Sequence, residues 1–535
     1  MSEQEVDGEP RAGSAVRNAR AADAMVHGTA DVFGRGSQLS VPKVETGIPG
    51  FDHVTMGGLP RRRATVLAGQ AGSAKTVFAA QFLAEGVERR QPGIFVTLEE
   101  PADDLRANFT TLGWDVAAWE EAGDFAFVDA SPLMREDGSV NRYDLSVLSA
   151  QIGHAVDRTG AERVVIDSLN SVLRLDEPEV ARQHLRALIA DLRAMGLTIV
   201  LTVETQGDPG STLSRHGIEE FVADSVVLLR NIREDKARRR TVEVLKMRGS
   251  MHRKGDYPFT VLPGMGVVVL PMSGVLLSSG SSDVRVTSGN AGLDELCHGG
   301  FFRDSITLVS GATGTGKTLL ATEFLGGGVQ RGEKVLLLAY EESPDQIFRN
   351  AAGWGHDFDR YERDGLLKVV ALYPEVASLD DHLVEIRDVI DGFGPTRVAI
   401  DSLSALERVS SGAGYREFII GLTSFVKQER VTTLLTAATP TLLGGTSITE
   451  GHISTLTDAI VLLRYVEMFG SVNRGLTVLK MRGSSHDHEI RQYTIDGGGM
   501  HIGQPFRSVG GILSGSVVNH ANLPSAFDDV LPPPV

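Results

Sequence analysis

The chain has 535 residues, with 52 basic and 69 acidic side chains and a formal charge of −17 at pH 7. This acidic balance argues against a broad nucleic-acid-binding surface, and the 42% of apolar residues exclude a wholly disordered chain. The single cysteine, Cys297, excludes a disulfide framework and a cysteine-based zinc module. Because the sequence has no apolar run of about 18 residues and no secretory leader, we expect a cytoplasmic protein without a membrane partner.

Residues 1–40 show no apolar period and are predicted to form a mobile arm. Beyond the arm, most of the sequence occurs twice. Residues 46–76 return as 287–318, and the blocks RVVIDSL, ADSVVLLR and VLKMRGS return as RVAIDSL, TDAIVLLR and VLKMRGS. This repetition predicts two homologous domains. Their expected bounds are 41–277 and 287–511, with a linker at 278–286 and a flexible tail at 512–535.

Each copy alternates short β-branched runs, such as ATVLAG and RVVID, with longer segments of helical period. That alternation is typical of βαβ units. The predicted fold class is therefore α/β, with a mostly parallel twisted sheet in each domain that helices cover on both faces.

A complete phosphate-loop motif, GATGTGKT, lies at 311–318 between the apolar run SITLVS and a helix-like segment. In such a loop the backbone N–H groups surround an anion, the lysine binds the outer phosphates and the hydroxyl that follows binds Mg²⁺. The motif predicts an ATP site made by Gly311, Thr313, Gly314, Thr315, Gly316, Lys317 and Thr318. A glycine-rich turn without a ligand is the alternative.

The first copy of this loop reads GQAGSAKT at 69–76 and has an alanine in place of the second motif glycine. An alanine fits this position if its backbone is helical. On that condition we predict a second ATP site made by Gly69, Gly72, Ser73, Ala74, Lys75 and Thr76.

Two aspartates, Asp167 and Asp401, each end an apolar strand of the expected sheets. Ligands of open α/β sheets bind at the carboxyl ends of the strands, so these carboxylates are predicted to hold Mg²⁺ or one of its water molecules. The alternative is that each aspartate caps the turn that follows it.

Glutamate pairs also occur at expected strand ends, Glu99 and Glu100 in VTLEEP and Glu341 and Glu342 in LAYEESP. A carboxylate there is suited to polarise an attacking water or to accept the proton of an attacking hydroxyl. Neighbouring strand residues point to opposite faces, so we expect one member of each pair to act directly and the other to orient it. Acidic residues at the start of a helix are the alternative.

Basic residues spaced two apart occur in the repeated KMRGS block, Lys246 with Arg248 and Lys480 with Arg482. On a strand, both cations of a pair lie on one face. In an oligomer such a pair is suited to contact the nucleotide of a neighbouring subunit as an arginine finger does. A charge-protected edge strand is the alternative.

The two copies differ where GIEEFVAD (217–224) aligns with GHISTLTD (451–458). An acid and an aromatic residue of the first copy, Glu220 and Phe221, correspond to Ser454 and Thr455 of the second. The two hydroxyls are candidate phosphate acceptors, and a turn that merely favours Ser and Thr is the alternative.

These motifs together resemble the KaiC family, the tandem RecA-like ATPases that include the circadian clock protein of cyanobacteria. The resemblance covers about residues 41–511 and rests on TSGNAGLDELCHGGFFRDSI, GATGTGKT, the second glutamate pair, IDSLSAL, SITEGHISTLTD and KMRGSSHD. It implies a double-ring homohexamer with ATP and Mg²⁺ at subunit interfaces. It also implies a first domain that is mainly an ATPase, and a second domain that phosphorylates and dephosphorylates its own Ser-Thr pair.

Carried over residue by residue, the resemblance makes Ser454 and Thr455 the phosphoacceptors, with Thr449 as an auxiliary hydroxyl. Glu341 becomes the base and is also counted among the Mg²⁺ ligands, with Glu342 beside it. The residues that it implies from the adjacent subunit are Lys480, Arg482 and Arg408.

The resemblance also implies partners. A KaiB-like protein is expected on the first-domain ring, and a histidine kinase is expected downstream, in a timing or stress-signalling system. The family's KaiA-recruiting tail is not recognisable after FRSVGGILSGS, which argues against dependence on KaiA and favours constitutive autophosphorylation.

Two rival functions follow from the same residues. One is a nucleotide-gated scaffold in which phosphorylation is incidental, and the other is a DNA-handling RecA relative, which the charge of −17 disfavours. Cys297 and His298 have no partner ligands at metal spacing, so we interpret them as turn and packing residues.

Overall fold

The computed structural model describes residues 41–130, 145–170, 178–205, 222–234, 237–270, 282–410, 412–439, 453–468, 470–507, 509–510, 512 and 518–519. The predictions for the arm at 1–40, for the Glu220–Phe221 pair and for Thr449 lie outside these residues. The described residues divide into two compact units, one up to residue 275 and one from residue 276.

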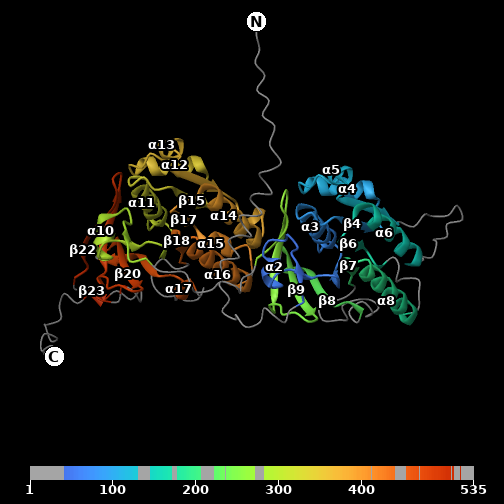
Figure 1. Ribbon diagram of the computed structural model, residues 1–535. Coiled ribbons are helices and arrows are strands. Elements are labelled where there is room, and N and C mark those ends of the chain that lie inside the picture. Colours follow the sequence, from blue (N-terminus) through green and yellow to red (C-terminus); the bar gives the residue numbers. More distant parts are fainter. Residues whose placement is uncertain are drawn as a thin grey trace, which may run out of the picture. The chain divides into compact units, whose positions relative to one another are not determined.

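Both units consist of alternating strands and helices (Figure 1). The elements of the first unit are β1 (Lys43–Val44), α2 (Phe51–Val54), β2 (Leu59–Pro60), β3 (Ala64–Gly69), α3 (Lys75–Glu88), β4 (Gly93–Thr97), α4 (Ala102–Thr111), α5 (Val116–Ala122), β5 (Phe125–Asp129), α6 (Leu145–Thr159), β6 (Arg163–Asp167), α8 (Pro178–Ala194), β7 (Thr198–Glu204), β8 (Ser225–Glu234), β9 (Ala237–Met247), β10 (Asp256–Leu262) and β11 (Gly266–Val269).

The second unit repeats this order. Its elements are β12 (Arg285–Val286), α10 (Ala291–Leu296), β13 (Phe301–Phe302), β14 (Ile306–Gly311), α11 (Lys317–Val329), β15 (Val335–Ala339), α12 (Pro344–Gly353), α13 (Phe358–Arg363), β16 (Leu367–Ala371), the 3₁₀ turn Pro374–Val376, α14 (Leu379–Phe393), β17 (Arg397–Asp401), α15 (Leu403–Glu407), α16 (Gly412–Gln428), β18 (Thr432–Ala438), α17 (Ile453–Leu456), β19 (Ala459–Met468), β20 (Ser471–Met481), β21 (Arg491–Asp496), β22 (Gly499–Pro505), β23 (Val509–Gly510) and β24 (Val518–Asn519).

Each unit contains a main sheet of nine strands within the described residues, and the strand orders are β5-β4-β6-β7-β3-β8-β9-β10-β11 and β16-β15-β17-β18-β14-β19-β20-β21-β22. The first six strands in each order pair in parallel, and the last three form antiparallel hairpins. The mostly parallel α/β sheet predicted from the repeats is thereby confirmed.

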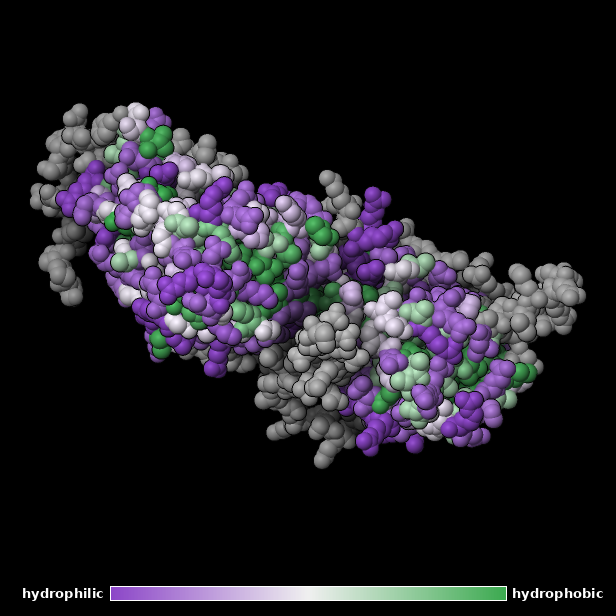
Figure 2. Space-filling view, turned by 90° about the horizontal axis from the view of Figure 1, so that it is seen from above, coloured by the Kyte–Doolittle hydropathy of each residue, from purple (hydrophilic) through white to green (hydrophobic). Residues whose placement is uncertain are grey.

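Strand residues alternate between two buried faces. In β3, Leu67 packs with Phe78 and Phe82 of α3, while Val66 and Ala68 pack with the apolar side chains of α6 and α8. Both faces of the parallel part are therefore covered, which explains why its strands are apolar throughout rather than alternating. In the view of Figure 2, hydrophilic residues cover most of the surface and hydrophobic ones show between them.

Two further features bear on the sequence predictions. None of the helices in the described ranges is long and apolar enough to cross a membrane. In the predicted flexible tail, β24 pairs with β23, so Val518 and Asn519 have regular structure where we expected none.

Candidate active site

The second phosphate loop joins β14 to α11 as its motif predicts. Gly314 and Gly316 have φ angles of 80° and 97°, which L-side chains rarely adopt. A methyl group on Gly311 would lie 2.6 Å from the carbonyl oxygen of Leu463. At these three glycines a side chain would either strain the backbone or come too close to neighbouring atoms.

The lysine of this loop is held above it. Lys317 Nζ donates hydrogen bonds to the carbonyl oxygens of Gly311 (2.9 Å) and Ala312 (3.0 Å). Burial lowers the pKa of Lys317, while the charges of Asp401 and Glu341 oppose that shift. A cation held in this way at the loop before a helix N-terminus suits an anion such as a phosphate.

Asp401 lies beside the loop at the carboxyl end of β17. The Thr318 hydroxyl donates to its Oδ2 (2.6 Å), and the Thr436 hydroxyl donates to its Oδ1. The carboxylate is thus turned toward the phosphate loop. It does not cap α15, whose N-cap residue is Ser402, a residue without a side-chain capping bond. Burial raises the pKa of Asp401, against hydrogen bonds from Thr318 and Thr436.

This pair of oxygen donors fits Mg²⁺, which proteins bind through one or two side chains together with substrate phosphates. In the part of the chain that the structure describes, no group of three or more His, Cys, Asp or Glu side chains is arranged to hold a metal. Thr318 and Asp401 are the residues that would hold Mg²⁺ here, together with the phosphates of a bound nucleotide.

The first phosphate loop has the same architecture between β3 and α3. Lys75 Nζ donates to the carbonyl oxygens of Gly69 (3.0 Å) and Gln70 (2.9 Å), and Asp167 accepts hydrogen bonds from Thr76 and Thr202. Our condition for Ala74 was wrong, because this residue has φ 66° and ψ 28°, a left-handed rather than a helical conformation. It occupies the conformation that Gly316 has in the second loop.

The glutamate pairs lie two and three residues beyond the ends of β4 and β15 rather than on the strands. Glu99 Oε1 accepts a hydrogen bond from Ser168 Oγ (2.8 Å), and Glu342 Oε2 accepts one from Asn350 Nδ2 (3.1 Å). Burial raises the pKa of Glu100 and of Glu342, and the negative charges of Asp167 and Asp401, respectively, add to the effect.

Arg408 belongs to the same edge of the sheet as Glu341. Its Nη1 lies 3.4 Å from Glu341 Oε1 in the same chain, and both side chains are exposed. Arg408 thus lies at the phosphate-loop edge of its own chain, and its contact with the nucleotide of an adjacent subunit stays a prediction.

Helix α17, which carries Ser454 and Thr455, lies at the opposite edge of the sheet. Asp458, two residues after this helix, exchanges hydrogen bonds with Ile306, the first residue of β14. The phosphate loop starts at Gly311, the last residue of the same strand. The six residues of β14 separate the two edges by about 16 Å. Ser454 is half-buried and Thr455 is exposed, whereas Thr457 is fully buried.

The cations of the second KMRGS block hold this helix. Lys480 Nζ donates to the carbonyl oxygens of Ser454 (2.5 Å) and Thr457 (2.7 Å), and Arg482 Nη2 donates to that of Thr455 (2.5 Å). Arg482 lies just past the end of β20, in a turn, rather than on the strand as predicted. In the first unit Lys246 similarly donates to the carbonyl of Ala223, and Arg248 is exposed.

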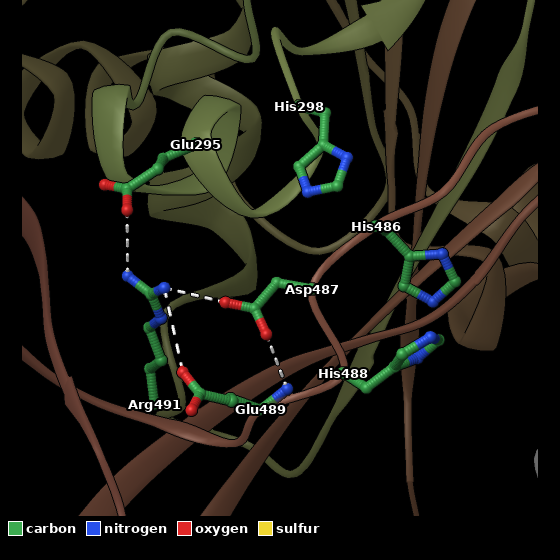
Figure 3. A pocket seen from close by; sticks show the side chains of 7 residues that line it. All are labelled: Glu295, His298, His486, Asp487, His488, Glu489 and Arg491. Atoms are coloured by element: carbon green, nitrogen blue, oxygen red, sulfur yellow. Dashed lines mark hydrogen bonds and ion pairs between the residues drawn. The ribbon is translucent and has the colours of Figure 1, made fainter. Parts of the chain in front are cut away.

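A polar pocket of about 570 Å³ in the second unit was missed by the sequence analysis (Figure 3). Arg491 binds Glu295, Asp487 and Glu489 on one side of it. The histidines on the other side are His298, His486 and His488, and the rings of the last two are 4.5 Å apart. Cys297 is buried in the core as expected, but His298 faces this pocket; the H-D-H sequence after KMRGSS was the available signal.

Comparison with known proteins agrees with this geometry. The model of the family "ATPase: KaiC" matches residues 44–274 and again 286–506. The chain is 55% identical over 478 residues to the circadian clock protein KaiC3 of Synechocystis sp., covering 89% of this chain and 94% of that protein. It is 47% identical to the circadian clock oscillator protein KaiC of Thermostichus vulcanus, with 90% and 92% covered, and 46% identical to that of Synechococcus elongatus, with 89% and 92% covered. The chain therefore belongs to the KaiC family of ATPases.

Proposed function

We propose that this protein is a Mg²⁺-ATP-dependent serine/threonine autokinase, autophosphatase and ATPase that assembles as a double-ring homohexamer. Its second domain phosphorylates Ser454 and Thr455, and its first domain is mainly an ATPase. The single observation that carries the proposal is that two hydroxyls, one half-buried and one exposed, occur on a helix braced by the repeated basic pair.

The transfer is proposed to run between chains. About 16 Å of sheet separates Ser454 and Thr455 from the phosphate loop of their own unit. A hydroxyl must come within about 3.5 Å of the phosphorus to react, so each acceptor has to meet the ATP of another subunit. The same separation supports the role of Lys480 and Arg482 as cations that approach a neighbour's nucleotide.

In the proposed reaction the acceptor oxygen attacks the γ-phosphorus of ATP and its proton passes to Glu341. The bond from this phosphorus to the β–γ bridging oxygen breaks, and ADP leaves. Lys317 binds the outer phosphates and stabilises their charge, while Glu342 orients the base. Mg²⁺, when bound by Thr318 and Asp401, neutralises charge on the phosphates.

The relatives are named as circadian clock proteins, and the partners proposed here follow from the family resemblance. The chain is placed in a circadian-clock or related timing or stress-signalling system. A KaiB-like protein is proposed on the first-domain ring and a histidine kinase downstream. Autophosphorylation is proposed to need no KaiA.

The acceptor assignment is tested by replacing Ser454 and Thr455 with Ala in the full chain and incubating it with Mg²⁺ and ³²P-labelled ATP. We expect incorporation to fall to background, while the ATP hydrolysis of the first site continues. Thr457→Ala is the matched control, because this hydroxyl is on the same turn but fully buried. Undiminished labelling of the double variant would contradict the assignment and favour a nucleotide-gated scaffold.

A further inference from the structure

The two phosphate loops of this chain have different residues at a position where both have a left-handed backbone. Ala74 and Gly316 both immediately precede the helix of their loop, and both have left-handed backbone angles. Glycine adopts this conformation freely, whereas the Cβ atom of an L-residue is crowded against the backbone in it. The first loop therefore carries a backbone strain that the second does not.

The side chains packed around position 316 are longer than those around position 74. A methyl group on Gly316 would lie 2.8 Å from Cδ1 of Ile495 and 3.1 Å from Cε of Met500. Ile495 and Met500 form a cross-strand pair between β21 and β22. An alanine at position 316 would therefore require the ends of these two side chains to move.

The equivalent cross-strand pair in the first unit is Val261 with Val267, between β10 and β11. The equivalence is fixed by a shared hydrogen bond: the N–H of Val267 donates to Gln81 of α3, and that of Met500 to Glu323 of α11, both at 2.7 Å. Valine has neither a Cδ1 nor a Cε atom. Ala74 accordingly packs into the same apolar cluster as these two valines.

A hydrogen bond to the loop also differs between the two units. In the second unit the buried Tyr493 hydroxyl donates to the carbonyl oxygen of Thr315, next to Gly316. The aromatic residue at the same place in the first unit is Phe259, which has no hydroxyl. Ser73, the counterpart of Thr315, has a buried hydroxyl without a hydrogen-bond partner among the described residues.

We propose that Ala74 is a positioning residue that makes the first phosphate loop less preorganised than the second, and that Val261 and Val267 accommodate its methyl group. The alanine lowers the fraction of molecules whose loop is ready to bind phosphates, and the apparent affinity of the first site falls in proportion. The inference rests on the proposal that both loops bind ATP. It assigns the difference between the sites to one side chain and its two apolar neighbours.

The test uses the full chain and the variant Ala74→Gly, titrated with Mg²⁺ and a non-hydrolysable ATP analogue. Hydrogen exchange of peptides that cover 70–76 and 312–318 reports a separate binding midpoint for each loop. We expect the midpoint of the first loop to fall about 5- to 10-fold, which corresponds to roughly 1 kcal/mol, and that of the second to stay unchanged. The KM of ATP hydrolysis at the first site should fall with kcat unchanged.

Ala71→Gly is the matched control, since it removes a methyl group from the same loop at a residue whose φ is not positive. It should not tighten binding. A midpoint that Ala74→Gly leaves unchanged, or that Ala71→Gly shifts equally, would overturn the proposal. If neither loop responds to the analogue in the unaltered chain, the proposed ATP sites fail instead.

The reciprocal exchange tests the role of the apolar neighbours. Gly316→Ala should weaken binding at the second loop by more than 10-fold, because strain and contact with Ile495 and Met500 act together. Adding Ile495→Val and Met500→Val should restore most of that loss. A triple variant that binds no better than Gly316→Ala alone would refute the accommodation by valine.

Discussion

Asp401 has two interpretations, a ligand of Mg²⁺ and a structural carboxylate, which a substitution can distinguish. Its carboxylate accepts hydrogen bonds from Thr318 and Thr436 and lies beside the phosphate loop. We expect Asp401→Asn to keep the shape of this site but to lose its charge. The Mg²⁺ concentration that half-saturates ATP hydrolysis at the second site should then rise about 10- to 100-fold.

A Mg²⁺ titration of steady-state ATP hydrolysis measures this effect. The first site is disabled by Lys75→Ala both in the Asp401→Asn variant and in the reference protein that keeps Asp401. Asp359→Asn, which removes the same charge from an exposed position on α13, serves as the control and should leave the Mg²⁺ requirement unchanged. An Asp401 variant with an unaltered Mg²⁺ requirement would show that the carboxylate only stabilises the fold.

At the residue scale, sequence motifs predicted which side chains surround the phosphate loops but not their conformations. Ala74 packs in one apolar cluster with Val261 and Val267, almost 200 residues away, so no local pattern shows what surrounds its methyl group. Local patterns also do not predict that Arg163 and Arg397 are fully buried. Arg397 is paired with Glu333, while Arg163 donates hydrogen bonds to Gln91 and to backbone carbonyl oxygens. A rule that arginines are exposed predicts the opposite.

At the scale of elements, the helices that follow the phosphate loops differ at several buried positions, and at one of these only the second helix has an ionisable side chain. Glu323 of α11 accepts hydrogen bonds from the N–H of Met500 (2.7 Å) and from Asn290 Nδ2 (2.9 Å), and only 5% of it is exposed. Its counterpart in α3 is the neutral Gln81. Burial raises the pKa of Glu323 above its ordinary value of 4.5, and the two hydrogen bonds oppose the shift.

This shift has a definite sign for stability. A carboxyl group whose pKa is higher in the folded than in the unfolded chain binds its proton more tightly when folded. The contribution of Glu323 is therefore fully present below pH 4.5 and is lost as the pH rises through the folded value. We expect the free energy of local opening at Met500 to fall by about 1.4 kcal/mol per pH unit in that window.

Hydrogen exchange of the Met500 amide, corrected for the intrinsic pH dependence of exchange, measures this slope. The Val267 amide, which donates to Gln81, provides an internal reference and should show none of it. In Glu323→Gln the slope at Met500 should disappear. A slope that persists in this variant would assign the pH dependence to another group, and His501 and Asp496, which lie nearby, would be the first to replace.

Element types followed well from the sequence because the strand runs are β-branched and the helices are amphipathic. Element ends followed less well, since Glu99, Glu341 and Arg482 lie just past strands that the pattern extends to them. The chain turns away from the sheet at these residues. The last backbone hydrogen bond between neighbouring strands depends on residues far along the chain, so the strand end does not follow from the local sequence. The polar pocket around Arg491 combines residues nearly 200 positions apart and was not predictable for the same reason.

At the scale of the whole molecule, transfer between chains makes a direct prediction. A chain with Glu341→Gln and Glu342→Gln lacks the base but keeps its acceptors, whereas one with Ser454→Ala and Thr455→Ala lacks acceptors but keeps the base. Each variant alone should show background labelling. Mixed under conditions that allow subunit exchange, the two should regain a substantial fraction of wild-type incorporation, all of it on the Glu341→Gln, Glu342→Gln chain.

Mass spectrometry of the mixture, with one variant isotopically labelled, identifies the chain that gains phosphate. The control is a mixture in which subunit exchange is prevented, where no recovery is expected. Recovery without exchange, or phosphate on residues other than Ser454 and Thr455, would contradict transfer between neighbouring subunits.

The repeats in the sequence predicted the two units and the class of their sheets, because a duplicated chain of this length must fold the same way twice. The family comparison agrees with that reading over nearly the whole chain. The antiparallel extension by β9–β11 and β20–β22 did not follow from local patterns. Its partner strands are set by hairpins whose register depends on long-range packing.

The position of helix α17 at one end of the sheet and of the phosphate loop at the other gives each chain a direction. In the proposed ring, a subunit that offers its acceptor to one neighbour receives an acceptor from a different one, so the contact is heterologous and has a head and a tail. Contacts of this kind either close into a ring or continue as a filament. In the proposed ring every acceptor meets a donor, whereas a filament leaves one acceptor and one donor without a partner at its ends.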